Sequence, residues 1–109
     1  MSKRPVKLLV NDICEAIQRI ENYIKGMSFE DFSQDQKSID AVARNLEIMG
    51  EAANRLPDEY KEKYSDIEWY KIVGLRHRIV HEYFGVDLQI IWQILQKDLP
   101  ELLQSLSRL

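Results

Sequence analysis

Apolar residues recur every three or four positions along most of the chain, which is the periodicity of an α-helix with one buried face. Within residues 6–27 the periodic residues are Leu9, Ile13, Ala16, Ile17, Ile20 and Ile24. Within residues 35–56 they are Ile39, Val42, Ala43, Leu46, Met49, Ala53 and Leu56. The pattern therefore predicts an amphipathic helix over each segment.

The segments between and after these helices carry turn and capping residues. A short acidic turn is expected from Ser28, with Phe29 and Phe32 closing one end of the bundle. Small residues around Gly50 would let another backbone approach the second helix closely. Residues 57–65 are polar and follow a helix that ends at Pro57.

The second half of the chain predicts three more helices. Ser65 and Glu68 have the spacing of a capping box and would start a helix that runs through Tyr83. Gly85 would end that helix, Asp87 would cap one over residues 88–97, and residues 98–101 would start the last. We therefore expect an all-α, antiparallel bundle of four to five helices in one domain, residues 1–109. A chain of this size buries a modest core alone, so we expect a homodimer.

Composition narrows the class of protein without naming a function. Cys14 is the only cysteine, so an internal disulfide is excluded, and its apolar neighbours favour a buried structural thiol over a nucleophile. No signal peptide and no membrane-spanning apolar run is visible, so we expect a cytoplasmic protein with no membrane partner.

Charge is distributed unevenly. The net charge is −3, which argues against a general nucleic-acid coat. Residues 27–70 carry 11 acidic and 5 basic side chains, whereas residues 71–85 carry Lys71, Arg76 and Arg78 against one acid, Glu82. A local basic site in an acidic protein indicates a small anionic target held at one place.

Residues 76–83 hold the side chains with the clearest chemistry. Arg76 offers a permanent charge in a planar fork that matches phosphate oxygens. His81 titrates near neutral pH and can take or give a proton. Together they could promote attack of a ribose 2′-hydroxyl on the adjacent phosphorus without a metal, and Tyr83 could contact phosphate or orient His81.

Spacing alone leaves this interpretation open. At about 100° per residue, Arg76 and His81 lie about 140° apart around a regular helix, so one helix would not point both at one atom. Either the helix loosens near Tyr83 and Gly85, or two copies in a dimer surround one cleft. We favour a combination of the two in which the dimer matters more. The plain alternative is a solvated arginine and an interior histidine.

The wider sequence supplies a resemblance. Residues 74–87, with the sequence GLRHRIVHEYFGVD, followed by Ile91-Trp92 and residues 98–100, resemble the HepT-like branch of the HEPN superfamily. The family pattern of arginine, four residues, histidine, one residue and tyrosine is matched by Arg76, His81 and Tyr83. The likeness extends over the whole chain, including residues 47–52. His77 departs from the asparagine or aspartate common after the motif arginine, which puts the rate and its pH profile in doubt.

The resemblance implies a dimeric helical bundle whose motifs meet at a cleft between subunits. It implies a metal-independent endoribonuclease toxin with no cofactor, in which Arg76 and His81 are catalytic and His77, Arg78 and Tyr83 bind RNA or support the site. It also implies a partner, an MntA-type nucleotidyltransferase antitoxin that inhibits the toxin by adding AMP to Tyr83. The RNA target, transfer RNA or messenger RNA, stays open.

Other interpretations remain at this point. His77 and His81 share a helical face and could hold a metal with Glu82 or a carboxylate from elsewhere, although their order does not match His-Glu-x-x-His. The chain could be an inactive HEPN module that only binds a nucleotide or a nucleotidyltransferase partner. Trp69, Trp92 and Tyr70 could stack on RNA bases, but we prefer core or dimer packing for the two tryptophans. The acids Glu51, Asp58, Glu59 and Glu62 predict a solvated face rather than a docking surface.

Overall fold

The computed structural model describes residues 3–82 and 88–109, and for residues 77–82 it describes the backbone alone. These residues are helical throughout, apart from short turns, in the order α1 (Val6–Ile24), α2 (Phe29–Gln34), α3 (Gln36–Arg55), α4 (Asp58–Lys63), α5 (Trp69–Glu82), α6 (Leu88–Gln93), a π-helical segment η1 (Ile94–Asp98) and α7 (Leu99–Leu106). The all-α class is confirmed.

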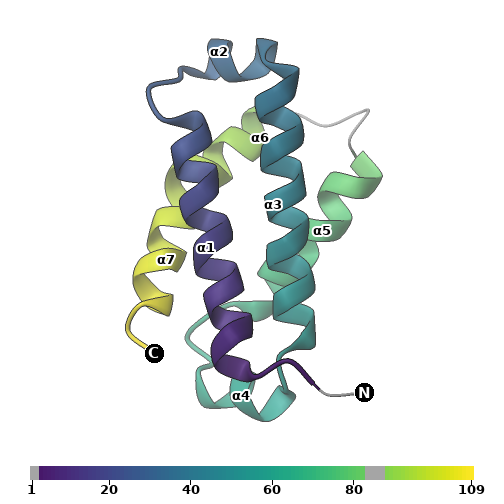
Figure 1. The fold of residues 1–109 in the computed structure, drawn as a ribbon, viewed down its shortest axis with the longest axis vertical. Coiled ribbons are helices and arrows are strands. Elements are labelled where there is room, and N and C mark those ends of the chain that lie inside the picture. The colour runs from purple at the N-terminus through teal and green to yellow at the C-terminus, as the bar shows by residue number, and fades with distance from the viewer. Residues whose placement is uncertain (1–2, 83–87) are drawn as a thin grey trace.

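The longer helices run up and down beside one another (Figure 1). Helix α3 packs along both α1 and α5, and α7 packs against α1 from the other side. The short helices α2 and α4 lie at opposite ends of this arrangement (Figure 1). The described part of the chain is thus an antiparallel bundle with α3 between α1 and α5.

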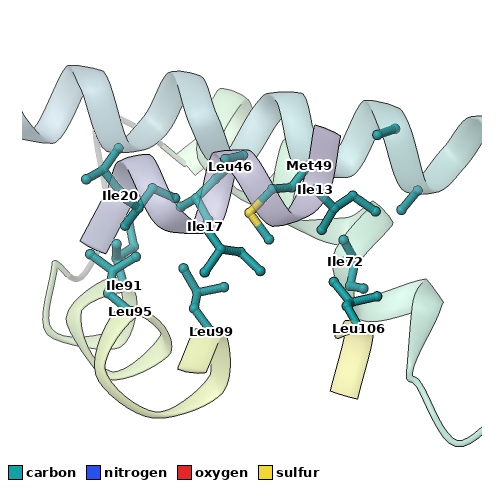
Figure 2. Close-up of a cluster of buried hydrophobic side chains, with 14 of the residues drawn as sticks. Ile13, Ile17, Ile20, Leu46, Met49, Ile72, Ile91, Leu95, Leu99 and Leu106 are labelled. Atoms are coloured by element: carbon teal, nitrogen blue, oxygen red, sulfur yellow. The ribbon is translucent and has the colours of Figure 1, made fainter. Parts of the chain in front are cut away.

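The apolar stripes predicted for α1 and α3 form the core. All six periodic residues of α1 are buried, and so are those of α3 except Ala43, which is partly buried. Figure 2 shows Ile13, Ile17 and Ile20 of α1 meeting side chains from the last third of the chain, among them Ile91, Leu95 and Leu99. Helical periodicity therefore identified both the elements and the faces that they bury.

Side chains cap the N-termini of both α2 and α3. Ser28 accepts a hydrogen bond from the Asp31 N–H and the Asp31 carboxylate accepts one from the Ser28 N–H, so the expected turn is instead a short helix with a capping box. Asp35 begins α3 and accepts hydrogen bonds from the Ser38 hydroxyl and N–H, which lower the pKa of the Asp35 carboxyl. Phe32 is buried against Trp92 with ring centroids 5.2 Å apart, so it closes the bundle end as predicted.

The predicted capping box at Ser65 is wrong. Helix α5 begins at Trp69, and Ser65 lies in the preceding turn. The buried Trp69 ring donates its indole N–H to the Tyr64 carbonyl at 3.1 Å, which fixes the chain in a non-helical turn up to that point. The Glu68 carboxylate instead accepts from the Tyr70 hydroxyl and pairs with Lys71.

Two further elements differ from the sequence prediction. Residues Asp58–Lys63 form α4, although they show no apolar periodicity. Acids lie in its first turn and lysines in its last, so their charges interact favourably with the helix dipole. The break expected between residues 97 and 98 is absent, because η1 joins α6 to α7 in helical conformation. The N–H of Leu99 reaches the carbonyl of Ile94, and this wider turn accommodates Pro100, which has no N–H to donate.

Candidate active site

Arg76 lies where α5 packs most closely on α3. A Cβ atom placed on Gly50 would come within 2.8 Å of the Arg76 Cβ, 3.0 Å of its backbone N and 3.2 Å of its Cγ. Real Cβ atoms essentially never approach so closely, so glycine at position 50 is what allows α5 to lie here. The first part of the Arg76 side chain is thereby seated on the backbone of α3.

The guanidinium of Arg76 meets an acid from the neighbouring helix. Its Nη1 donates to Oε2 of Glu51 at 2.9 Å, and the side chains of Arg76 and Glu51 are 26% and 57% exposed. The Nε of Arg76 is buried and makes no hydrogen bond with the described residues. The arginine is therefore held at both ends of its side chain while part of its surface stays open to solvent.

His81 follows Arg76 on the same helix. The backbone of α5 stays α-helical from Arg76 through His81 to Glu82, so positions 76 and 81 lie about 140° apart around its axis. The side chains of His77, Arg78 and His81 lie outside the described residues, as does Tyr83 altogether. The predicted loosening near Tyr83 and the predicted helix end and cap at Gly85 and Asp87 fall there too.

A groove borders the Arg76–Glu51 pair on the α3 side. It has a volume of about 400 Å³ and lies over α1 and α3, lined by Leu9, Asp12, Arg44, Glu47, Ile48, Glu51, Ala52 and Arg55. Its walls carry charges of both signs around an apolar floor. Glu51 thus belongs both to this groove and to the surroundings of Arg76.

Comparison with known proteins identifies the family. The family model described as "Ribonuclease HepT-like" matches residues 13–109, a span that includes every predicted site residue. The chain belongs to the HepT-like ribonuclease family. The family resemblance inferred from residues 74–100 is therefore confirmed.

Three similar proteins show how far the likeness extends along the chain. A "Probable ribonuclease HepT" of Thermococcus cleftensis is 38% identical over 107 residues, covering 98% of this chain and 97% of its own length. A protein of Caldanaerobacter subterraneus named "Putative RNase" is 49% identical over 79 residues, covering 72% and 70%. Another "Putative RNase", from Methanocaldococcus jannaschii, is 34% identical over 109 residues, covering 100% of this chain and 90% of its own length. No solved structure matches the chain.

One site residue of this HepT-like chain is not evident from the sequence. Glu51, Asp58, Glu59 and Glu62 are all exposed, as predicted for a solvated face. Glu51 also makes an ion pair with Arg76, which that prediction did not include. The nearest signal in the sequence is Gly50, because a glycine within a helix can mark a point where another backbone comes close.

The aromatic and thiol candidates are explained by packing. Trp69 is 5% exposed, and Trp92 is partly buried against Phe32, so packing of the tryptophans is confirmed. Tyr70 is 71% exposed and donates to Glu68. Burial raises the pKa of the Cys14 thiol, which keeps it protonated and fits the structural role predicted for it.

The structure bears on metal ligands and on membrane-spanning helices only within the described residues. The proposed ligands His77, His81 and Glu82 have side chains outside the described residues, so that hypothesis is not tested. Among the side chains that are described, no three histidine, cysteine or acidic residues are grouped closely enough to hold a metal ion. No helix in the described ranges is both long and apolar enough to cross a membrane.

Proposed function

We propose that this chain is the toxin of a toxin–antitoxin pair, a metal-independent endoribonuclease that acts on RNA in the cytoplasm. Membership of the HepT-like ribonuclease family supports the activity, as do the RNase names of its relatives. The observation that carries the proposal is Arg76, a motif arginine held in place between two helices yet 26% exposed. A cation in that state can meet a phosphate without first being ordered.

The proposed reaction is an internal transfer at phosphorus. His81 removes the proton of a ribose 2′-hydroxyl, the 2′-oxygen bonds to the adjacent phosphorus, and the bond from phosphorus to the 5′-oxygen breaks. His81, now protonated, acts as general acid and gives that proton to the leaving 5′-oxygen, so the products are a 2′,3′-cyclic phosphate and a 5′-hydroxyl. Arg76 stabilises the charge that builds on the phosphoryl oxygens, and His77, Arg78 and Tyr83 support the RNA.

The proposed active unit is a homodimer. The 140° between positions 76 and 81 prevents one continuous helix from directing both residues at one phosphate. Two α5 helices facing each other across a two-fold axis can supply Arg76 from one copy and His81 from the other. The dimer therefore completes a site that a single copy leaves divided.

The first test is cleavage of total RNA by the purified protein with and without a strong chelator. We expect equal cleavage in both, and products that end in a 2′,3′-cyclic phosphate, because the proposed chemistry uses only side chains. Loss of cleavage on chelation, restored by a divalent metal, would instead support the metal site at His77 and His81. No cleavage in either sample would favour an inactive module that only binds a nucleotide or its partner.

The second test concerns regulation by the proposed MntA-type partner. We expect incubation with that nucleotidyltransferase and ATP to add one AMP to Tyr83, seen by mass spectrometry as an adduct on the peptide that contains it. The adduct would place a bulky, charged group beside Arg76 and His81 and stop cleavage. Tyr83→Phe is the control and should stay unmodified; an adduct on Tyr70, or none at all, would contradict the assignment.

A further inference from the structure

Two consecutive residues of α3 contact opposite ends of one side chain on α5. The backbone at Gly50 supports Cβ and Cγ of Arg76, and the carboxylate of Glu51 accepts from its Nη1 at 2.9 Å. An arginine has several rotatable bonds and loses side-chain entropy when it is fixed in one geometry. Here the neighbouring helix has already fixed both the stem and the tip.

We propose that Glu51 is a positioning residue for Arg76 in RNA cleavage, an inference that rests on the proposed function. The guanidinium has five N–H groups, and the contact with Glu51 occupies Nη1 alone. No hydrogen bond joins Nη2 to an acceptor among the described residues, so its donors can meet a phosphate. Glu51 thereby orders the arginine before the substrate arrives, so that the cost of ordering does not fall on the transition state.

The alternative role for Glu51 is competition with the phosphate, and the geometry favours positioning. Glu51 is 57% exposed, so water screens its attraction for the guanidinium and limits how strongly it can hold the arginine away from RNA. The phosphoryl group in the transition state carries more negative charge than one carboxylate. The phosphate can therefore share the guanidinium with Glu51 without displacing it.

The test compares Glu51→Ala and Glu51→Gln with matched changes at Glu47. Glu47 lies one turn earlier on α3, lines the same groove and pairs only weakly with Arg44, at 3.9 Å. Both sites change the net charge equally, so any general effect on RNA attraction appears in both. Cleavage rates of an RNA oligonucleotide are measured over a range of substrate concentrations to separate kcat from KM.

We expect Glu51→Ala to lower kcat about tenfold with little change in KM, because an interaction that matters in the transition state is lost. The kcat of Glu51→Gln should fall between those of the unchanged protein and Glu51→Ala, since the glutamine amide oxygen can still accept a hydrogen bond from Nη1. Glu47→Ala and Glu47→Gln should cleave like the unchanged protein. In an Arg76→Lys background, Glu51→Ala should cost nothing further, because the fork that it orders is gone.

Three results would overturn the inference. An unchanged or raised kcat in Glu51→Ala would exclude positioning, and a raised one would show competition. Equal losses in Glu47→Ala and Glu51→Ala would show a general charge effect. Full additivity with Arg76→Lys would show that Glu51 does not act through the arginine.

A measurement without RNA separates this inference from the proposed function. Rotation about the Nε–Cζ bond of Arg76 can be measured by nitrogen NMR. It should be slow in the unchanged protein and faster in Glu51→Ala. Slow rotation without any RNA cleavage would contradict the ribonuclease proposal but still support the ordering of Arg76 by Glu51. Cleavage with rapid rotation in both proteins would overturn the positioning role alone.

Discussion

His81→Ala is expected to reduce RNA cleavage roughly 10²- to 10⁴-fold, the range typical of losing a general acid or base. Arg76→Ala should reduce it roughly 10²- to 10³-fold, as removal of one group that stabilises developing charge commonly does. Both changes should leave the circular dichroism spectrum helical. The measurement is the initial rate on a labelled RNA oligonucleotide, with growth of cells that express each variant as the second readout.

Mixing the two inactive variants tests how the site is assembled. If each site takes Arg76 from one copy and His81 from the other, half of randomly mixed dimers hold one intact site out of two, so about a quarter of the original activity returns. A site built within one copy would recover nothing on mixing. Wild-type rates and toxicity in both single variants would contradict the assignment of these residues altogether.

Gly50→Ala is expected to destabilise the fold although alanine is the better helix former. The added Cβ would lie 2.8 Å from the Arg76 Cβ and 3.0 Å from its backbone N, atoms that cannot move unless α5 moves. Overpacking of this kind costs about 1–3 kcal/mol, against a gain in helix propensity of about 1 kcal/mol. We expect the free energy of unfolding in urea to fall by up to about 2 kcal/mol.

Gly74→Ala is the matched control for that change. Gly74 is also within a helix, but a Cβ there would meet nothing within 4 Å among the described residues. The propensity gain is then unopposed, and the free energy of unfolding should rise by up to about 1 kcal/mol. Protein concentration is held constant, since dimerisation would add to both values. Stabilisation by Gly50→Ala to the same extent would show that α5 is not seated on α3 as described.

The fold was predictable wherever one helical face is apolar. Helices α1 and α3 have unbroken stripes at spacings of three and four, and their bounds and buried residues followed from that pattern. Helix α4 carries no such stripe and depends on charge order and on rings that meet across the chain, such as Tyr60 and Trp69. Such ring contacts do not follow a helical period, and the Ser65 cap failed because the Trp69 indole bonds to the Tyr64 carbonyl and helix α5 begins only at Trp69.

The site was predictable only in part. Residue types and spacing alone left the role of Arg76 open, and the resemblance of the surrounding sequence to the family singled it out; the family match spans it. The partner of Arg76 comes from 25 residues earlier, and nothing in the local sequence joins Glu51 to it except the glycine beside it. A pair across two helices depends on how the helices pack, which the core residues decide.

The π-helical turn η1 has a consequence for which substitutions this region tolerates. Ile91, Leu95 and Leu99 are each four residues apart, and in an α-helix every such step rotates a side chain by about 40°. A π-helical turn has more residues and offsets part of this rotation. The continuous helical segment formed by α6, η1 and α7 therefore keeps one apolar face toward α1 despite Pro100. Losing a single residue from Ile94–Asp98 would turn Leu99 and Leu106 toward water. Natural length variation is therefore expected at the loops and not within this helical segment.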